Sequence, residues 1–112
     1  MMRTSDIDTI VSIATAQGEG AIGIVRLSGP HAISIANPCF LSRTSLNTVP
    51  PRTLIYGRFV SSGQALDEVL ASVMYGPNSY TGENTVEFNC HGCPFLLRRV
   101  VEALVNSGAR LA

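Results

Sequence analysis

The amino-acid sequence predicts an α+β domain with a mixed or antiparallel sheet and the element order β-β-α-β-β-β-α. Five stretches rich in β-branched residues are separated by short turns, a pattern typical of strands. Two further segments have a proline near the first helical position, which is typical of helices. The 112 residues, of which 46% are hydrophobic and 14% charged, suit a single domain with its own core.

The first half of the chain is predicted to fold as strand, strand and helix. Residues 9–14 and 22–27 are rich in Ile and Val and are expected to be strands, joined by a glycine-containing turn at 17–20. A helix is expected to start after Ser28, where Gly29 and Pro30 follow, and to stop at Pro38. The polar residues 1–7 are expected to be flexible, so the domain is taken as 8–112.

The middle of the chain is predicted to contain two longer strands. These are expected at about 53–60 and 66–75, with a turn at 61–63 between them. Residues 41–51 and 76–82 are expected to be loops, because they are rich in Pro, Gly, Asn and Ser.

The last two predicted elements are a strand at 85–90 and a helix that begins at Pro94. Gly108 is well placed to end this helix. Its apolar residues recur at helical spacing on one face, and they are Leu97, Val100, Val101 and Leu104.

Composition excludes a P-loop nucleotide hydrolase and disfavours a free-standing nucleic-acid binder. The formal net charge is zero, all eight cationic side chains are Arg, and Lys is absent. A phosphate-binding P-loop needs a Lys, so no nucleotide hydrolysis of that kind resides in these residues. A free-standing nucleic-acid binder usually has a basic excess, which this chain lacks.

No stretch of the chain resembles a membrane or export signal. The longest apolar runs, such as residues 9–16, are far shorter than the roughly 20 residues that a membrane-spanning helix needs. The first residues lack the apolar stretch of a secretory signal. Three cysteines, an odd number, are not typical of a secreted disulfide framework. We therefore expect a cytoplasmic protein with no membrane partner.

The glycines of residues 18–23 match the dinucleotide-binding fingerprint GxGxxG. That motif requires a helix to follow it, so that the amino end of the helix meets the pyrophosphate. Here a strand is predicted to follow. The context therefore favours a simple hairpin turn.

Cys90 and Cys93 have the spacing of a redox dithiol and stand between a predicted strand and a predicted helix. A helix amino end lowers the pKa of a thiol, so redox chemistry has a mechanism there. A zinc site would need Cys39 and His31 as well, and both lie far away in sequence. A packing role for Cys90 is favoured over both, because a buried free Cys behaves as a small hydrophobe.

Arg26 and Glu87 are the candidate site residues. Arg26 interrupts an apolar strand, and the alternation along residues 85–91 places Glu87, Asn89 and His91 on one face. One interpretation is a solvated strand face on which Arg26 and Glu87 form an ordinary ion pair. The other is a polar ligand site built on rigid strands. His91 alone is more often a structural residue than a catalytic base, and no catalytic or metal-binding residue is assigned.

Four segments resemble the tRNA-modification GTPases of the MnmE (TrmE) family, in the same order along the chain. They are DTIVSIAT at 8–15, GEGAIGIVRLSG at 18–29, GPNSYTGENTVEFNCHG at 76–92 and GARLA at 108–112. Long blocks in the right order are far more specific than any short motif. The chain is therefore identified as similar to the amino-terminal domain of this family.

The resemblance implies a tetrahydrofolate-binding and dimerisation domain over residues 8–112. Two copies of such a domain pair as a homodimer, with their first strands exchanged. A tetrahydrofolate derivative, expected to be 5-formyltetrahydrofolate, supplies a one-carbon unit for the wobble uridine of tRNA. GTP, Mg²⁺ and K⁺ belong to a GTPase domain expected beyond residue 112, and the partner is MnmG (GidA), which uses FAD and NADH.

The family's folate contacts, carried over by position, are Arg26 and Glu87. A pterin edge offers two neighbouring N–H groups that the Glu87 carboxylate could accept, and Arg26 could bind a formyl or carboxylate oxygen. A further contact in the family is a Lys expected after residue 112. The sequence departs from the family at Ala16, Ala21 and Cys93, which changes the first turn and the start of the second helix.

The residues leave two alternative functions open. The first is a stand-alone folate-dependent aminomethyl- or formyl-transfer domain, for which His91 is the candidate acid or base. The second is a small redox or zinc domain that uses Cys90 and Cys93.

Overall fold

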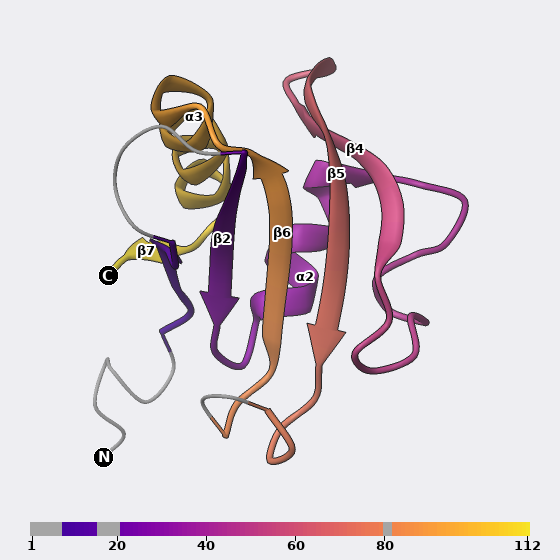
Figure 1. Cartoon of the computed structure of the whole chain (residues 1–112). Helices are drawn as coiled ribbons and strands as arrows, with labels where there is room; N and C mark the ends of the chain where they lie inside the picture. Colours follow the sequence, from indigo (N-terminus) through magenta and orange to yellow (C-terminus); the bar gives the residue numbers. More distant parts are fainter. Residues whose placement is uncertain (1–7, 16–20, 80–81) are drawn as a thin grey trace.

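The computed structural model describes residues 8–15, 21–79 and 82–112. Within these ranges the strands form one seven-stranded sheet in the order β3-β4-β5-β6-β2-β1-β7 (Figure 1). The elements along the chain are β1 (Ile10–Ile13), β2 (Ile22–Ser28), α2 (Ala32–Ala36), the 3₁₀ turn η1 (Asn37–Cys39), β3 (Phe40–Leu41), β4 (Ile55–Ser61), β5 (Gln64–Met74), β6 (Thr85–His91), α3 (Pro94–Asn106) and β7 (Arg110–Leu111). Neighbouring strands are antiparallel except for β1 and β7, which are parallel. The predicted α+β domain with a mixed sheet is confirmed.

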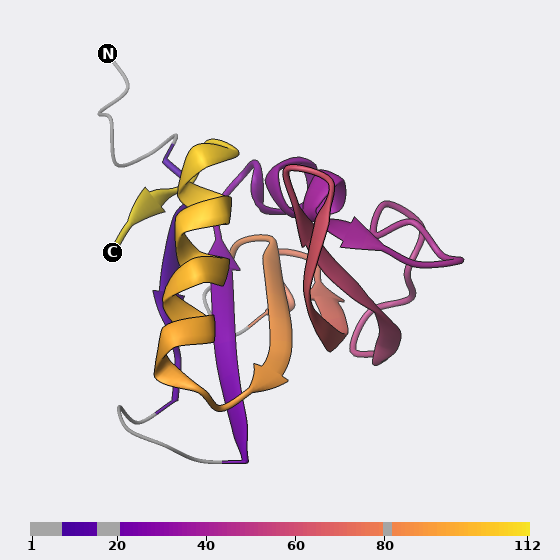
Figure 2. The ribbon, with the colours of Figure 1, turned by 90° about the horizontal axis from the view of Figure 1, so that it is seen from above.

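Both helices cover the same face of the sheet. In Figure 1, α2 lies behind β6, and Figure 2 shows α3 lying along β1 and β2. The four apolar α3 residues predicted from helical spacing are all buried. Gly23 allows α3 to approach β2, because a Cβ there would lie only 2.5 Å from Leu97 Cδ1.

The covered face of β6 forms the centre of the core. Val86, Phe88 and Cys90 point into it, as the alternation predicts, and all three are buried. The ring of Phe59 meets that of Phe88 edge-on at a centroid distance of 5.1 Å, a favoured geometry for aromatic pairs. The strand positions between these residues consequently face away from the helices.

The structure corrects the predicted element order in two places. The segment expected to be a loop at 41–51 starts within β3, and a further strand, β7, follows α3. Each of these strands has two residues, too few to show an alternating pattern in sequence. The first helix is also short: Ser28 ends β2, and the α-helix ends at Ala36, just before Pro38.

Three expectations from the sequence are not tested by the structure. The flexible segment 1–7 and the turn at 17–20 lie outside the described residues. β1 pairs with β2 of its own chain, so the exchange of first strands between two copies stays a prediction.

Candidate functional site

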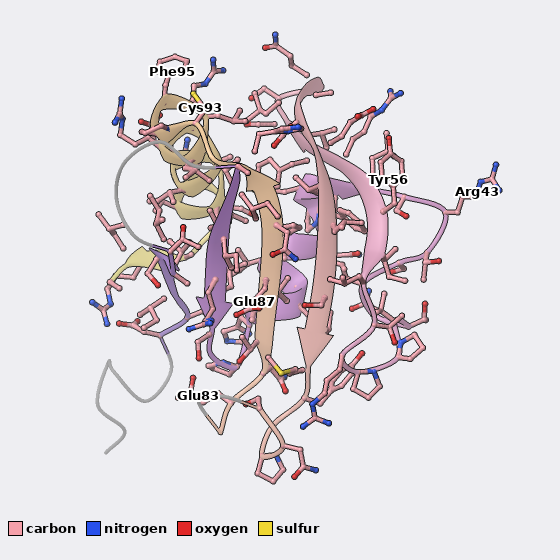
Figure 3. The ribbon with its side chains drawn as sticks, in the orientation of Figure 1. Arg43, Tyr56, Glu83, Glu87, Cys93 and Phe95 are labelled. Carbon is pink, nitrogen blue, oxygen red and sulfur yellow. The ribbon has the colours of Figure 1, made fainter. Side chains whose placement is uncertain are left out.

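The face of the sheet opposite the helices carries the candidate residues. Arg26 of β2 and Glu87 of β6 are direct cross-strand partners, and Ser12 of β1 and Ser72 of β5 extend the same row. Figure 3 shows Glu87 near the middle of this uncovered face, with the helices behind the sheet. The two residues that the sequence proposed as a site are therefore brought together by the central strand pair.

Arg26 and Glu87 form an ion pair. The distance between Arg26 Nε and Glu87 Oε2 is 2.6 Å, and the two side chains are 33% and 13% exposed. A carboxylate has about four lone-pair positions on its two oxygens, so Glu87 can accept ligand hydrogen bonds while bonded to Arg26. The pair fits both interpretations from the sequence, an ordinary ion pair and a pre-positioned polar site.

One end of the uncovered face is closed. In the row next to Arg26 and Glu87, towards the start of β6, Ser28 and Thr85 are cross-strand partners and Met74 pairs with Thr85. All three are buried, with exposed fractions of 6%, 0% and 6%. The Asn84 side chain holds the chain just after β5, because its Oδ1 accepts the Gly76 N–H at 3.1 Å.

The other end of the same face is open and hollowed. A hollow of about 310 Å³ is lined by residues of β2, β4, β5 and β6, among them Ile22, Tyr56, Leu70, Asn89 and His91. Hollows of about 450 and 660 Å³ lie beside β1 and β3, at the two edges of the sheet. Arg26 and Glu87 line none of these three, so the hollow on the uncovered face begins one row away from the ion pair.

His91 is engaged by Asp67, a residue that the sequence did not single out. The His91 ring Nδ1 lies 2.6 Å from Asp67 Oδ1, and the His91 backbone N–H donates to Asp67 Oδ2 at 2.8 Å. The Asp67 side chain is only 7% exposed. Asp67 therefore fixes the end of β6 to β5 and orients the His91 ring. This contact fits a structural histidine and an oriented acid or base equally well, so it does not decide between the two interpretations of His91. No local motif could reveal this contact, because the residues are 24 positions apart.

The cysteines do not form an activated dithiol. Cys90 is buried and Cys93 is exposed. Burial, helped by the nearby Asp67 charge, raises the pKa of the Cys90 thiol to about 12, whereas a redox nucleophile needs a low thiol pKa. Across residues 8–15, 21–79 and 82–112, no three His, Cys, Asp or Glu side chains are grouped to hold a metal ion. The redox or zinc alternative thus gains no support.

No helix in the described part of the chain is long and apolar enough to cross a membrane.

Comparisons with known proteins place the chain in a single family. Residues 9–112 match the family model described as "GTP-binding protein TrmE N-terminus". The chain is 47% identical over 109 residues to the tRNA modification GTPase MnmE of Staphylococcus aureus strain bovine RF122 / ET3-1. It is 46% identical over the same length to the proteins of that name from strains Newman and USA300 / TCH1516. These matches cover 96% of this chain and 24% of each relative.

Proposed function

Because the chain belongs to the family of TrmE amino-terminal domains, we propose that it binds a tetrahydrofolate derivative and pairs as a homodimer. It is the non-catalytic, ligand-binding part of a larger cytoplasmic protein that modifies tRNA. GTP, Mg²⁺ and K⁺ act in the remainder of that protein, which also works with MnmG (GidA) and tRNA. The bound folate, with 5-formyltetrahydrofolate as the expected form, supplies the one-carbon unit.

The observation that carries the proposal is the position of Arg26 and Glu87. The resemblance implies that both contact folate, and they lie side by side on an uncovered sheet face. Glu87 would accept the neighbouring amino and ring N–H groups of the pterin, and Arg26 would donate to a formyl or carboxylate oxygen. Both side chains stand on central strands and hold one another, which limits the ordering that a ligand must impose.

The edges of the sheet support the proposal of a dimer. The two edge strands, β3 and β7, have two residues each, and they pair with only two of the seven residues of β4 and two of the four residues of β1. Unpaired strand edges favour pairing with another chain, and a symmetric exchange of the first strands closes at two copies. If the ligand lies near the dimer interface, ligand binding and dimerisation strengthen each other by the same factor.

One titration tests both parts of the proposal. Purified protein is titrated with 5-formyltetrahydrofolate while its mass in solution is followed by light scattering over a concentration series. A hydrogen bond to a charged group contributes about 1.5–3 kcal/mol. Glu87→Ala and Arg26→Ala should therefore each weaken the affinity by about tenfold to a hundredfold. Arg99→Ala, which removes an exposed cation from α3 and lines none of the three hollows, is the control and should bind as the parent does.

Two results would contradict these proposals separately. Parent-like affinity in both the Arg26 and the Glu87 variant would place the folate site elsewhere. A folded protein that stays monomeric at high micromolar concentration with folate present would exclude the dimer.

A further inference from the structure

The sheet edge formed by β3 and β4 carries a hollow that the proposed folate site does not use. Its volume is about 660 Å³, and it is lined by residues 41–44 and 55–58. The lining includes the guanidinium groups of Arg43 and Arg58 and the ring of Tyr56, and among the described residues no Asp or Glu contributes to it. The chemistry of this hollow therefore suits an anion that also has a flat ring.

The two cations of the hollow are not neutralised by ion pairs. Two arginines elsewhere in the chain are paired with carboxylates, whereas neither Arg43 nor Arg58 forms an ion pair with any carboxylate of the described residues. Glu68, the cross-strand neighbour of Arg58, accepts a hydrogen bond from Tyr56 and does not line the hollow. A chain with zero net charge thus has a locally positive sheet edge.

Tyr56 presents an aromatic ring beside these cations. It is 59% exposed, and its hydroxyl donates to Glu68 Oε1 at 2.9 Å, which holds the far end of the ring. Tyr56 and Arg58 are two residues apart on β4, so their side chains stand on the same face, about 6.6 Å from each other. A base stacked on Tyr56 would therefore have a guanidinium next to it for a phosphate.

The loop that carries Arg43 is anchored to β4. Ser42 Oγ donates to the Tyr56 carbonyl at 2.8 Å, and the Thr44 N–H donates to Ser42 Oγ at 3.5 Å. In Figure 3, Tyr56 lies on β4 and Arg43 extends outward from the neighbouring loop on the same side of the molecule. Because the fold sets the position of this loop, a ligand has less backbone to order when it binds.

From the unpaired cations, the exposed ring and the anchored loop, we infer that the β3–β4 edge binds single-stranded RNA. Arg43 and Arg58 donate to phosphate oxygens, and Tyr56 stacks on an unpaired base, a combination by which proteins hold single strands. Tyr56 also lines the hollow on the uncovered face, so a nucleotide bound at this edge lies beside that hollow. The inference rests on the proposed role in tRNA modification and does not depend on folate binding.

The first test measures the phosphate contacts through their salt dependence. Binding of a fluorescently labelled RNA hairpin with a single-stranded anticodon loop is followed by anisotropy at several salt concentrations. Each phosphate contact to a single strand contributes about 0.7 to the slope of log affinity against log salt. Arg43→Ala and Arg58→Ala should each reduce the slope by about that amount and weaken binding. Arg99→Ala is the matched control, because Arg99 is exposed on α3 and lines none of the three hollows.

The second test separates stacking from attraction between charges. Tyr56→Ala should weaken RNA binding by about five- to a hundredfold with the salt slope unchanged, and Tyr56→Phe should bind as the parent does. Phe95→Ala is the control, because Phe95 is 61% exposed and lines none of the three hollows. Inorganic polyphosphate, which has no bases, should depend on the two arginines and not on Tyr56.

The outcomes distinguish this inference from the proposed function. A parent chain that binds 5-formyltetrahydrofolate but no RNA at low salt would overturn the inference and leave folate binding intact. RNA binding that is unchanged in Tyr56→Ala, or no weaker in the Arg43 and Arg58 variants than in Arg99→Ala, would also overturn it. So would an Arg43→Ala variant with a lower mass in solution and normal RNA affinity, because the edge would then contact a second copy. RNA binding that depends on all three residues in a chain that binds no folate would support the inference while the folate site fails.

Discussion

Successive residues of β6 belong to two surfaces with different physical properties. Val86, Phe88 and Cys90 face α2 and α3 and are at most 3% exposed. Glu87 and Asn89 face the other way and are partly exposed. The covered face is closely packed, with an edge-on Phe59–Phe88 pair, whereas the uncovered face has an ion pair and a hollow. One strand thus supplies the core and the candidate site at alternate positions, so each can be changed with little effect on the other.

The largest expected difference is in thiol reactivity, between Cys90 on the covered face and Cys93 just before α3. A pKa of about 12 instead of the ordinary 9.0 leaves Cys90 about a thousandfold less thiolate at pH 8. A disulfide reagent at pH 8 should therefore modify the exposed Cys93 quickly, and Cys90 only when the chain unfolds. Absorbance after reagent addition gives the number and rate of the modified thiols. In Cys93→Ser the fast phase should disappear, and its persistence would show that the covered face opens readily.

The next largest difference is expected in the free energy of unfolding, between substitutions of Phe88 and of its neighbour Asn89. Phe88 is fully buried, and truncating such a residue costs about 3–5 kcal/mol. Asn89→Ala on the other face should change the free energy of unfolding by about 0.5 kcal/mol or less, as surface substitutions do. Urea denaturation measures both. If Phe88→Ala does not fold, Phe88→Leu retains part of the packing and should still lose more stability than Asn89→Ala. Equal losses of unfolding free energy in Phe88→Ala and Asn89→Ala would contradict the division of β6 into a core face and a site face.

The sequence predicted the features that depend on local pattern. The alternation along β6 and the buried face of α3 are both found in the structure. The ion pair between Arg26 and Glu87 was one of two open interpretations, and it depends on strands that are distant in sequence. The folate contacts themselves came from family resemblance and stay proposals. A period of two places residues on faces regardless of tertiary structure, which is why these positions were predictable.

The features that sequence reasoning missed depend on contacts between distant segments. β7 forms because Arg110 and Leu111 reach β1, about a hundred positions earlier in the chain. Asp67 meets His91 only because β5 and β6 are neighbours in the sheet. The hollow beside Leu70 requires the order of four strands, which no local pattern contains.

The smallest expected effect is the contribution of the Arg26–Glu87 pair to stability. A double-mutant cycle with Arg26→Ala and Glu87→Ala isolates the pair, which is needed because Arg26 has a further interaction. With side chains 33% and 13% exposed, we expect a coupling energy of about 0.2–1 kcal/mol without ligand, decreasing with added salt. The Arg110–Asp8 pair, whose Nε–Oδ2 distance is 2.5 Å and whose side chains are 56% and 20% exposed, is the matched control and should couple less. Urea denaturation of the four proteins in each cycle gives both energies.

A coupling above about 2 kcal/mol for Arg26 and Glu87 would make the pair part of the structural core. A small coupling together with a tenfold or greater loss of folate affinity would show that the two charges are held in place mainly for the ligand.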